Sequence, residues 1–130
     1  MVTQQAAIAT AKAFVQDILA TGFRLKKAIL FGSFVRNEQL KWSDIDIALV
    51  ADEFLGVASI DISHFLSVKI STRKYTPIEP HTFPTDYFEQ GDPFIDEIKR
   101  TGIELPLQET TTIKNSSPQA AGKSGSAPAA

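Results

Sequence analysis

The chain has 130 residues with a formal net charge of −2 at neutral pH, and 43% of its residues are hydrophobic. This composition predicts one domain with an apolar core and does not indicate a strongly basic nucleic-acid-binding protein. The sequence has no cysteine, which excludes disulfides, thiolate zinc sites and cysteine nucleophiles. Because it has only two histidines, we expect any metal ion to be held by carboxylates, which favour magnesium or manganese.

Two further features bound the organisation of the chain. No run of roughly 18 to 20 apolar residues and no secretory leader pattern occurs, so we expect a soluble cytoplasmic protein. Residues 108–130 contain no aromatic residue and a single large aliphatic one, Ile113. Such a segment cannot bury enough apolar surface to offset the entropy of ordering it. We therefore predict a folded domain over residues 1–107 and a disordered, low-complexity tail over residues 108–130.

The first half of the predicted domain contains a helix and two strands. Apolar residues recur at helical spacing over residues 3–20, where Thr3 can cap the start. Short apolar runs at residues 27–31 and 45–50 predict buried strands. The second strand begins with alternating residues, which places Asp46 on the face opposite to its apolar neighbours.

The second half adds two helices and two weaker strands. We expect an amphipathic helix within residues 59–70, and a strand over residues 74–79 that Pro77 would confine to a sheet edge. An Asp-Pro pair at the start of residues 93–101 and a glycine after them predict a helix there, and residues 103–106 favour a short strand. The expected fold is α/β (α+β), with helices flanking a small mixed β-sheet.

The residues best suited to chemistry lie between the first two predicted strands. Gly32 ends the first strand and lets the backbone turn sharply and approach a ligand closely. Ser33 follows and, if it begins a helix, its hydroxyl and the free N–H groups suit a phosphate. Arg36, one helical turn later, could add a positive charge to that phosphate. Alone, a Gly-Ser pair is more often only a turn.

A pair of aspartates marks the start of the second strand. Asp44 and Asp46 are two residues apart, and on a strand residues so spaced project from the same face. The two carboxylates repel each other unless a cation lies between them, and a divalent ion can also bridge to the phosphates of a nucleotide. Alone, an Asp-x-Asp pair is more often a solvated strand end, so the argument depends on its position after the Gly-Ser pair.

The order and spacing of these residues resemble a known signature. Gly-Ser, ten residues and Asp-x-Asp is the pattern of the DNA polymerase beta-like nucleotidyltransferase superfamily. The runs GSFVRN, WSDIDIALV, PIEPHTF and DPFIDEIKRTGIEL look like those of the minimal nucleotidyltransferases of prokaryotes. The resemblance implies the polymerase beta-like nucleotidyltransferase fold. It also implies a metal-dependent enzyme that transfers a nucleoside monophosphate, expected to be AMP from ATP, to an acceptor hydroxyl with loss of pyrophosphate.

The resemblance implies roles for individual residues. Gly32 and Ser33 would hold the triphosphate of the nucleotide, while Asp44 and Asp46 would bind two Mg2+ ions, or Mn2+ in their place. Members of the superfamily use a third carboxylate, on a later strand, to complete the second metal site and to help deprotonate the acceptor. Glu79, in the predicted third strand, is our candidate for this catalytic and metal-binding role.

Glu79 departs from the aspartate that the superfamily more often has at this point. The alternatives are weaker, because we expect Asp61 to lie on a helix and Asp86 in a capping turn. His81 is expected to pack in a loop rather than to contact the substrate. Asn37 stands where glycine is frequent, and asparagine tolerates left-handed backbone better than most residues.

Three hypotheses about function follow. In the first, the chain is an active nucleotidyltransferase whose acceptor lies on a separate helical protein of the HEPN type, with this chain as the antitoxin of a toxin–antitoxin pair, as the resemblance implies. The alternative is a non-catalytic module that keeps the same fold and binds a nucleotide or a partner. A sugar-nucleotide glycosyltransferase, which also uses Asp-x-Asp, is disfavoured because such chains are normally much longer.

Overall fold

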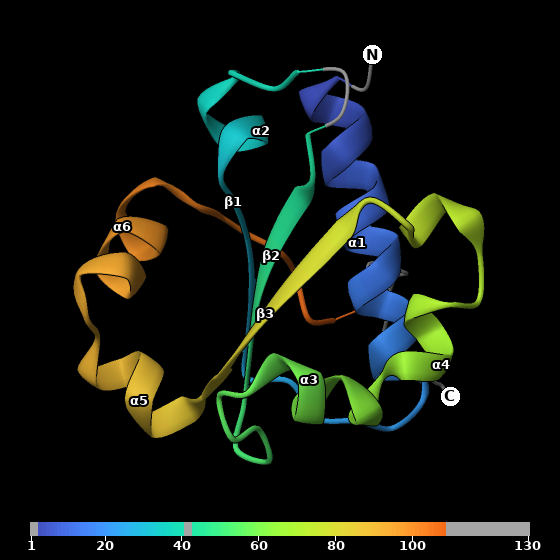
Figure 1. Ribbon diagram of the computed structural model, residues 1–130. Helices are drawn as coiled ribbons and strands as arrows, with labels where there is room; N and C mark the ends of the chain where they lie inside the picture. The colour runs from blue at the N-terminus through green and yellow to red at the C-terminus, as the bar shows by residue number, and fades with distance from the viewer. Residues whose placement is uncertain (1–2, 41–42, 109–130) are drawn as a thin grey trace, which may run out of the picture.

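One mixed β-sheet organises the residues that the computed structural model describes, 3–40 and 43–108. Its four strands run in the order β3-β2-β1-β4 (Figure 1). β1 pairs antiparallel with both β2 and β4, whereas β3 lies parallel to β2. The predicted α/β fold with a small mixed sheet is therefore confirmed. The strands are β1 (Lys27–Phe31), β2 (Ile45–Ala51), β3 (Ile78–Pro84) and β4 (Ile103–Glu104).

Helices cover both faces of the sheet, with α1 and several short helices on one face and α5 and α6 on the other (Figure 1). Within the described ranges, none of these helices has the length and apolar character needed to cross a membrane. The predicted tail, apart from Gln108, lies outside the described residues. The helices are α1 (Gln4–Ala20), α2 (Ser33–Arg36), α3 (Ala58–Asp61), α4 (Leu66–Lys69), α5 (Thr85–Gln90) and α6 (Pro93–Thr101), with single 3-10 turns at η1 (Ile62–His64) and η2 (Arg73–Tyr75).

The two longest helices begin at the capping residues that the sequence indicates. The Thr3 side chain accepts a hydrogen bond from the backbone N–H of Ala6 at 3.0 Å, and α1 follows. The Asp92 carboxylate accepts one from the N–H of Ile95 at 2.7 Å, and proline occupies the first turn of α6. Each cap satisfies an N–H that has no partner within its own helix, so both helix predictions are confirmed.

Two apolar clusters, one on each face of the sheet, form the core. The first packs α1 against β1 and β2, and Phe14 on α1 lies edge-on to Phe65 and Tyr75, with ring centroids 6.1 Å and 5.1 Å away. The second packs α5 and α6 against the other face and includes Ala48 of β2. Because side chains alternate along a strand, Asp46 projects on the same face as Ala48, as predicted.

The predicted third strand is displaced along the chain. It was expected over residues 74–79, whereas β3 begins at Ile78. Tyr75 explains the difference. Its ring is buried against Phe14, and its hydroxyl donates to Asp17 on α1 at 2.5 Å. These contacts hold residues 73–75 in the turn η2 instead of a strand. Burial raises the pKa of Tyr75 above its ordinary value, and the hydrogen bond to Asp17 raises it further, so the phenol remains protonated.

β3 lies at the edge of the sheet, which is the position that its two prolines require. Proline has no N–H to donate and is tolerated where that position faces away from the neighbouring strand. Pro80 and Pro84 are an even number of residues apart and therefore present the missing donor on the same side of β3. Pro77, the residue expected at this edge, instead precedes the strand, where its carbonyl accepts a hydrogen bond from the N–H of Ile45 at 2.9 Å.

The prediction of one continuous amphipathic helix within residues 59–70 is wrong, because the segment forms three short helical pieces, α3, η1 and α4. The break before α4 falls at Phe65, whose φ of −141° is not helical. This conformation brings the Phe65 ring into the core beside Phe14. The burial of one large side chain therefore outweighs the local preference for a continuous helix.

Asp61, at the end of α3, is a buried carboxylate that joins three segments. It accepts hydrogen bonds from the backbone N–H groups of Leu55 and Gly56 at 2.9 Å and Val57 at 3.2 Å, and from the Thr82 hydroxyl at 2.8 Å. Burial acts to raise the pKa of Asp61, but these hydrogen bonds outweigh it and the pKa lies below its ordinary value. The charged carboxylate thus fixes the loop between β2 and α3 against β3.

We predict that Asp61→Asn lowers the free energy of unfolding at neutral pH by about 1–3 kcal/mol, because the amide leaves at least one buried donor unpaired. The folded-state pKa is lowered, so the charged carboxylate stabilises the fold above about pH 4 and this stabilisation is lost as the pH falls through the folded value. Urea unfolding should therefore show a difference between wild type and variant that shrinks in acid. Asp52→Asn, at an exposed position, is the matched control and should change little. Equal stability of Asp61→Asn and wild type at neutral pH would contradict this account.

Candidate functional site

The pairing of β1 with β2 brings Gly32 and Asp46 together at one end of the sheet. Phe31 is the register partner of Asp46, so Gly32, the next residue along the chain, lies beside that carboxylate. Gly32 has φ 88° and ψ −152°, a combination that is essentially restricted to glycine. A Cβ at this position would collide with Oδ2 of Asp46 and lie 3.2 Å from its carboxyl carbon. Glycine is therefore required both for the backbone conformation and for the space.

The short helix α2 and the start of α1 fix the turn that follows Gly32. The N–H of Val35 donates to the Gly32 carbonyl at 3.1 Å. Gln4, on the first turn of α1, donates from its side chain to the carbonyl of Phe34 at 2.9 Å. Asn37 ends α2 with φ 58°, the left-handed conformation that its side chain tolerates. The backbone of the predicted phosphate site is thus held from both of its ends.

Asp46 is half-buried and hydrogen-bonded to a histidine that the sequence analysis did not assign to the site. The His81 Nε2 lies 3.1 Å from Oδ1 of Asp46, and the two side chains are 31% and 25% exposed. The expectation that His81 packs in a loop is wrong, because β3 continues through it and turns it to the face of Asp46. The sequence offered one signal, because His81 lies two residues after Glu79 and residues so spaced on a strand share a face. Pro80 between them argued against a strand at this point and so hid that signal.

The other predicted carboxylates lie at the same end of the sheet. Glu79 is the register partner of Asp46 across the parallel pair of β2 and β3, and its side chain is exposed. Asp44 is also exposed and lies one residue before β2. Ser33 is half-buried at the start of α2. In residues 3–40 and 43–108, no three Asp, Glu or His side chains lie close enough together to hold a metal ion.

Arg36 and the alternatives to Glu79 are placed differently. Arg36 is exposed at the end of α2, and its Nε donates to the Glu38 carboxylate at 2.8 Å. Asp61 lies on α3 as expected, and its carboxylate is already hydrogen-bonded to the backbone of the loop between β2 and α3. Asp86 lies in the first turn of α5, an exposed helical position rather than the expected capping turn. Neither aspartate is therefore a better candidate than Glu79 for the third carboxylate.

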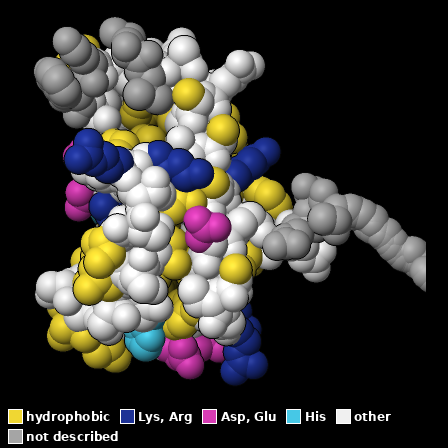
Figure 2. Space-filling view, turned by 90° about the vertical axis from the view of Figure 1, so that its right-hand side faces the viewer, with side chains coloured by type: hydrophobic (Ala, Val, Ile, Leu, Met, Phe, Trp, Pro, Cys, Tyr) yellow, Lys and Arg dark blue, Asp and Glu magenta, His cyan; other side chains and the backbone are white. Residues whose placement is uncertain are grey.

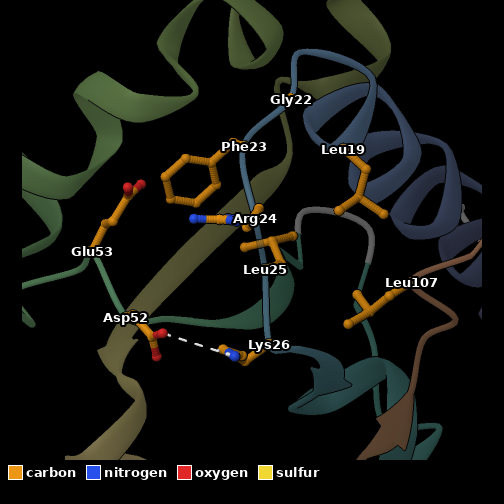
Figure 3. A pocket seen from close by; sticks show the side chains of 9 residues that line it. All are labelled: Leu19, Gly22, Phe23, Arg24, Leu25, Lys26, Asp52, Glu53 and Leu107. Carbon is orange, nitrogen blue, oxygen red and sulfur yellow. Dashed lines mark ion pairs between the residues drawn. The ribbon is translucent and has the colours of Figure 1, made fainter.

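A cavity of about 580 Å³ lies away from these residues (Figure 3). Its lining includes Arg24, Lys26 and Asp52, and the last two form an ion pair at 3.8 Å. These residues lie where β1 begins and β2 ends, whereas Gly32 and Asp46 lie where β1 ends and β2 begins. The cavity is therefore at the opposite end of the strand pair and is not part of the site around Gly32 and Asp46.

The structure is that of a small α/β domain in which a glycine turn faces an aspartate across an antiparallel strand pair. Domains of this class are suited to holding phosphates beside carboxylates. The sequence profile described as "Nucleotidyltransferase domain" matches residues 11–105, a range that includes every predicted site residue. The chain therefore belongs to the nucleotidyltransferase domain family, which makes it a transferase of nucleoside monophosphates with a nucleotide substrate. No curated protein matches the chain.

We predict that Gly32→Ala destabilises the protein more than Gly22→Ala, a matched control. Both glycines have positive φ, and a residue with a Cβ costs about 1–3 kcal/mol in such a conformation. A Cβ at Gly22 would meet nothing within 4 Å, whereas one at Gly32 would collide with Asp46. The extra cost at Gly32 should shrink in an Asp46→Ala background, which removes the colliding carboxylate. Urea unfolding of Gly22→Ala, Gly32→Ala, Asp46→Ala and the Gly32→Ala/Asp46→Ala double variant measures these costs. Equal costs at the two glycines would contradict the close approach.

Proposed function

We propose that the protein transfers AMP from ATP to an acceptor hydroxyl. In this proposal Gly32 and Ser33 hold the triphosphate, and Asp44, Asp46 and Glu79 form the metal-binding and catalytic site. The observation that carries the proposal is the close approach of the Gly32 backbone to the Asp46 carboxylate. It supports a geometry in which a phosphate at the glycine turn is adjacent to carboxylates that can share a cation with it.

The turn at Gly32 suits a triphosphate because it has no side chain to keep a ligand away from the backbone. Ser33 adds a hydroxyl at the start of α2, within the same turn. Arg36 is the cation predicted for this site, and its ion pair with Glu38 is exposed, so the pair contributes little to stability. The guanidinium can therefore exchange Glu38 for a phosphate at small cost, which supports a role for Arg36 in nucleotide binding.

The donor set fits a hard divalent cation. Asp44, Asp46 and Glu79 offer only carboxylate oxygens, the ligands that Mg2+ and Mn2+ prefer. Magnesium is commonly held by one or two carboxylates together with phosphate oxygens of the substrate, so Asp44 and Asp46 can suffice when a nucleotide is present. We therefore propose two Mg2+ ions bound together with the nucleotide, with Mn2+ as a substitute. Bound there, they would neutralise charge on the triphosphate and acidify the acceptor hydroxyl.

Glu79 is the proposed base for the acceptor. Its exposed side chain on the edge strand, next to Asp46, is open to a hydroxyl that approaches from solvent. The acceptor oxygen forms a bond to the α-phosphorus, and the bond from that phosphorus to the bridging oxygen of pyrophosphate breaks. Pyrophosphate leaves with the electron pair, and the proton of the hydroxyl passes to Glu79.

We further propose that the acceptor hydroxyl belongs to a helical protein of the HEPN type, with this chain as the antitoxin. Exposed hydrophobic side chains at Leu55 in the loop before α3, at Ile60 on α3 and at Ile70 directly after α4 support a partner-binding surface. Figure 2 shows the face formed by α1 and the short helices, where Lys and Arg side chains form a band above exposed hydrophobic ones. Such a surface can bury apolar area and attract an acidic partner. With labelled ATP the label should appear on a purified HEPN-type protein, and label found only on RNA or small molecules would contradict this acceptor.

We predict that Asp44→Asn and Asp46→Asn each abolish transfer while the fold survives. Loss of an outer partner of a metal ligand typically costs about 10–100-fold, so loss of a ligand should cost more than about 100-fold. Pyrophosphate release measured with each of the four nucleoside triphosphates also tests the preference for ATP. Asp52→Asn, at the other end of β2, is the control and should remain active. If wild type binds ATP but releases no pyrophosphate with any nucleotide or partner, the non-catalytic module is the correct interpretation.

We predict that Mg2+ with ATP raises the melting temperature of the wild type, because a ligand that binds the folded state stabilises it. Glu79→Gln should weaken this effect, because it removes one of the three carboxylates proposed to bind the metal. Transfer should fall strongly in the same variant, since the acceptor loses its base. Nucleotide binding should fall less, because the glycine turn and both aspartates remain. Glu104→Gln, on the opposite edge strand, provides the control. Normal transfer by Glu79→Gln would show that another residue serves as the base.

A further inference from the structure

We propose that His81 is a positioning residue that sets the orientation of the Asp46 carboxylate. The inference rests on the proposed function for its catalytic consequence, but the contact itself stands on geometry alone. β3 lies parallel to β2, with His81 in register with Ala48 and Glu79 in register with Asp46. His81 therefore projects on the same face of the sheet as Asp46, at a position two residues further along the strands. From there its ring reaches back to the Asp46 carboxylate.

The chemistry of the two groups defines the direction of the hydrogen bond. An ionised carboxylate can only accept, so Nε2 of His81 must carry the proton that bridges the 3.1 Å to Oδ1 of Asp46. A neutral imidazole that makes this hydrogen bond is the Nε2–H tautomer. The donor comes from a different strand, 35 residues away in sequence, so it restrains Asp46 independently of the backbone of β2.

The second oxygen of Asp46 shows what the restraint achieves. With Oδ1 bonded to His81, Oδ2 is directed toward Gly32, where an added Cβ would collide with it. One oxygen is thus held by β3 and the other is presented to the turn where the triphosphate is proposed to bind. The two oxygens of a carboxylate are equivalent, so the hydrogen bond from His81 acts on the tilt of the carboxylate plane and keeps one oxygen aimed at the turn.

Aromatic packing holds the imidazole ring in place. The Phe31 ring lies edge-on to it with a centroid distance of 4.9 Å, and the Phe94 ring lies 6.2 Å away on α6. Phe31 and Phe94 also contact each other at 5.6 Å. The histidine therefore joins the apolar cluster under α5 and α6 to the polar end of the sheet, and a donor fixed in this way loses little entropy when it binds Asp46.

His64 provides a matched control within the same chain. Its ring is exposed but also packs against two phenylalanines, with centroid distances of 5.0 Å to Phe23 and 6.0 Å to Phe54. It belongs to η1, on the other side of the sheet, where Phe54 is part of the cluster under α1. A substitution at His64 thus changes a histidine packed against two aromatic rings without touching Asp46.

The experiment compares His81→Phe, His81→Gln and His64→Phe with the wild type. His81→Phe keeps a ring in the pocket but removes the donor, whereas the amide nitrogen of His81→Gln can take the place of Nε2. We expect His81→Phe to lower kcat and the affinity for Mn2+ in the presence of ATP by about 10–100-fold, the usual cost of removing an outer partner of a metal ligand. KM for ATP should change less, because the glycine turn is intact. His81→Gln should recover most of the loss, and His64→Phe should behave like the wild type.

A second readout does not depend on transfer. Nitrogen NMR of the wild type without nucleotide should show His81 as the Nε2–H tautomer, and this preference should weaken in Asp46→Ala. If the tautomer is Nδ1–H, or if His81→Phe binds Mn2+ and ATP as tightly as His64→Phe, the inference is overturned while the proposed function stands. If the wild type neither binds Mn2+ with ATP nor releases pyrophosphate, the proposed function fails, and the tautomer alone decides whether His81 positions Asp46.

Discussion

The close approach of the Gly32 backbone to the Asp46 carboxylate is the contact on which the rest of the site depends. It exists because β1 and β2 pair antiparallel with Phe31 opposite Asp46, so the end of one strand meets the start of the other. A shift of the register by one residue would turn Asp46 to the other face of the sheet. Any side chain at Gly32 would separate the two strands at the point where they must come closest.

The two faces of the sheet contribute differently to this arrangement. The face under α1 is an apolar cluster that supplies most of the buried hydrophobic residues and ends in the aromatic contacts of Phe14. The face under α5 and α6 is smaller, and its apolar part gives way to Asp46 and His81 toward the end of the sheet that carries the site. Burial on the first face stabilises the strand pairing, and the second face uses that pairing to present polar groups.

β3 combines two requirements that would conflict in a central strand. Its position at the edge allows two prolines, which also remove donors that another chain could pair with. The same edge leaves Glu79 exposed in register with Asp46, as the proposed role of Glu79 requires. Asp61 accepts a hydrogen bond from Thr82 of this strand, so a side-chain contact holds the edge strand in addition to its pairing with its single neighbour, β2.

The sequence by itself determined the features that depend on residues near one another in the chain. Thr3 and Asp92 mark helix starts through local hydrogen bonds, and the apolar runs of β1 and β2 mark buried strands. The spacing from Gly32 to Asp46 indicated the family because its residue types and separation are read along the chain. Only the tertiary structure decided the start of β3, the break at Phe65 and the contact between His81 and Asp46. Each depends on a partner distant in sequence, such as Phe14 for Phe65 or a parallel strand for His81, and local propensity contains no information about that partner.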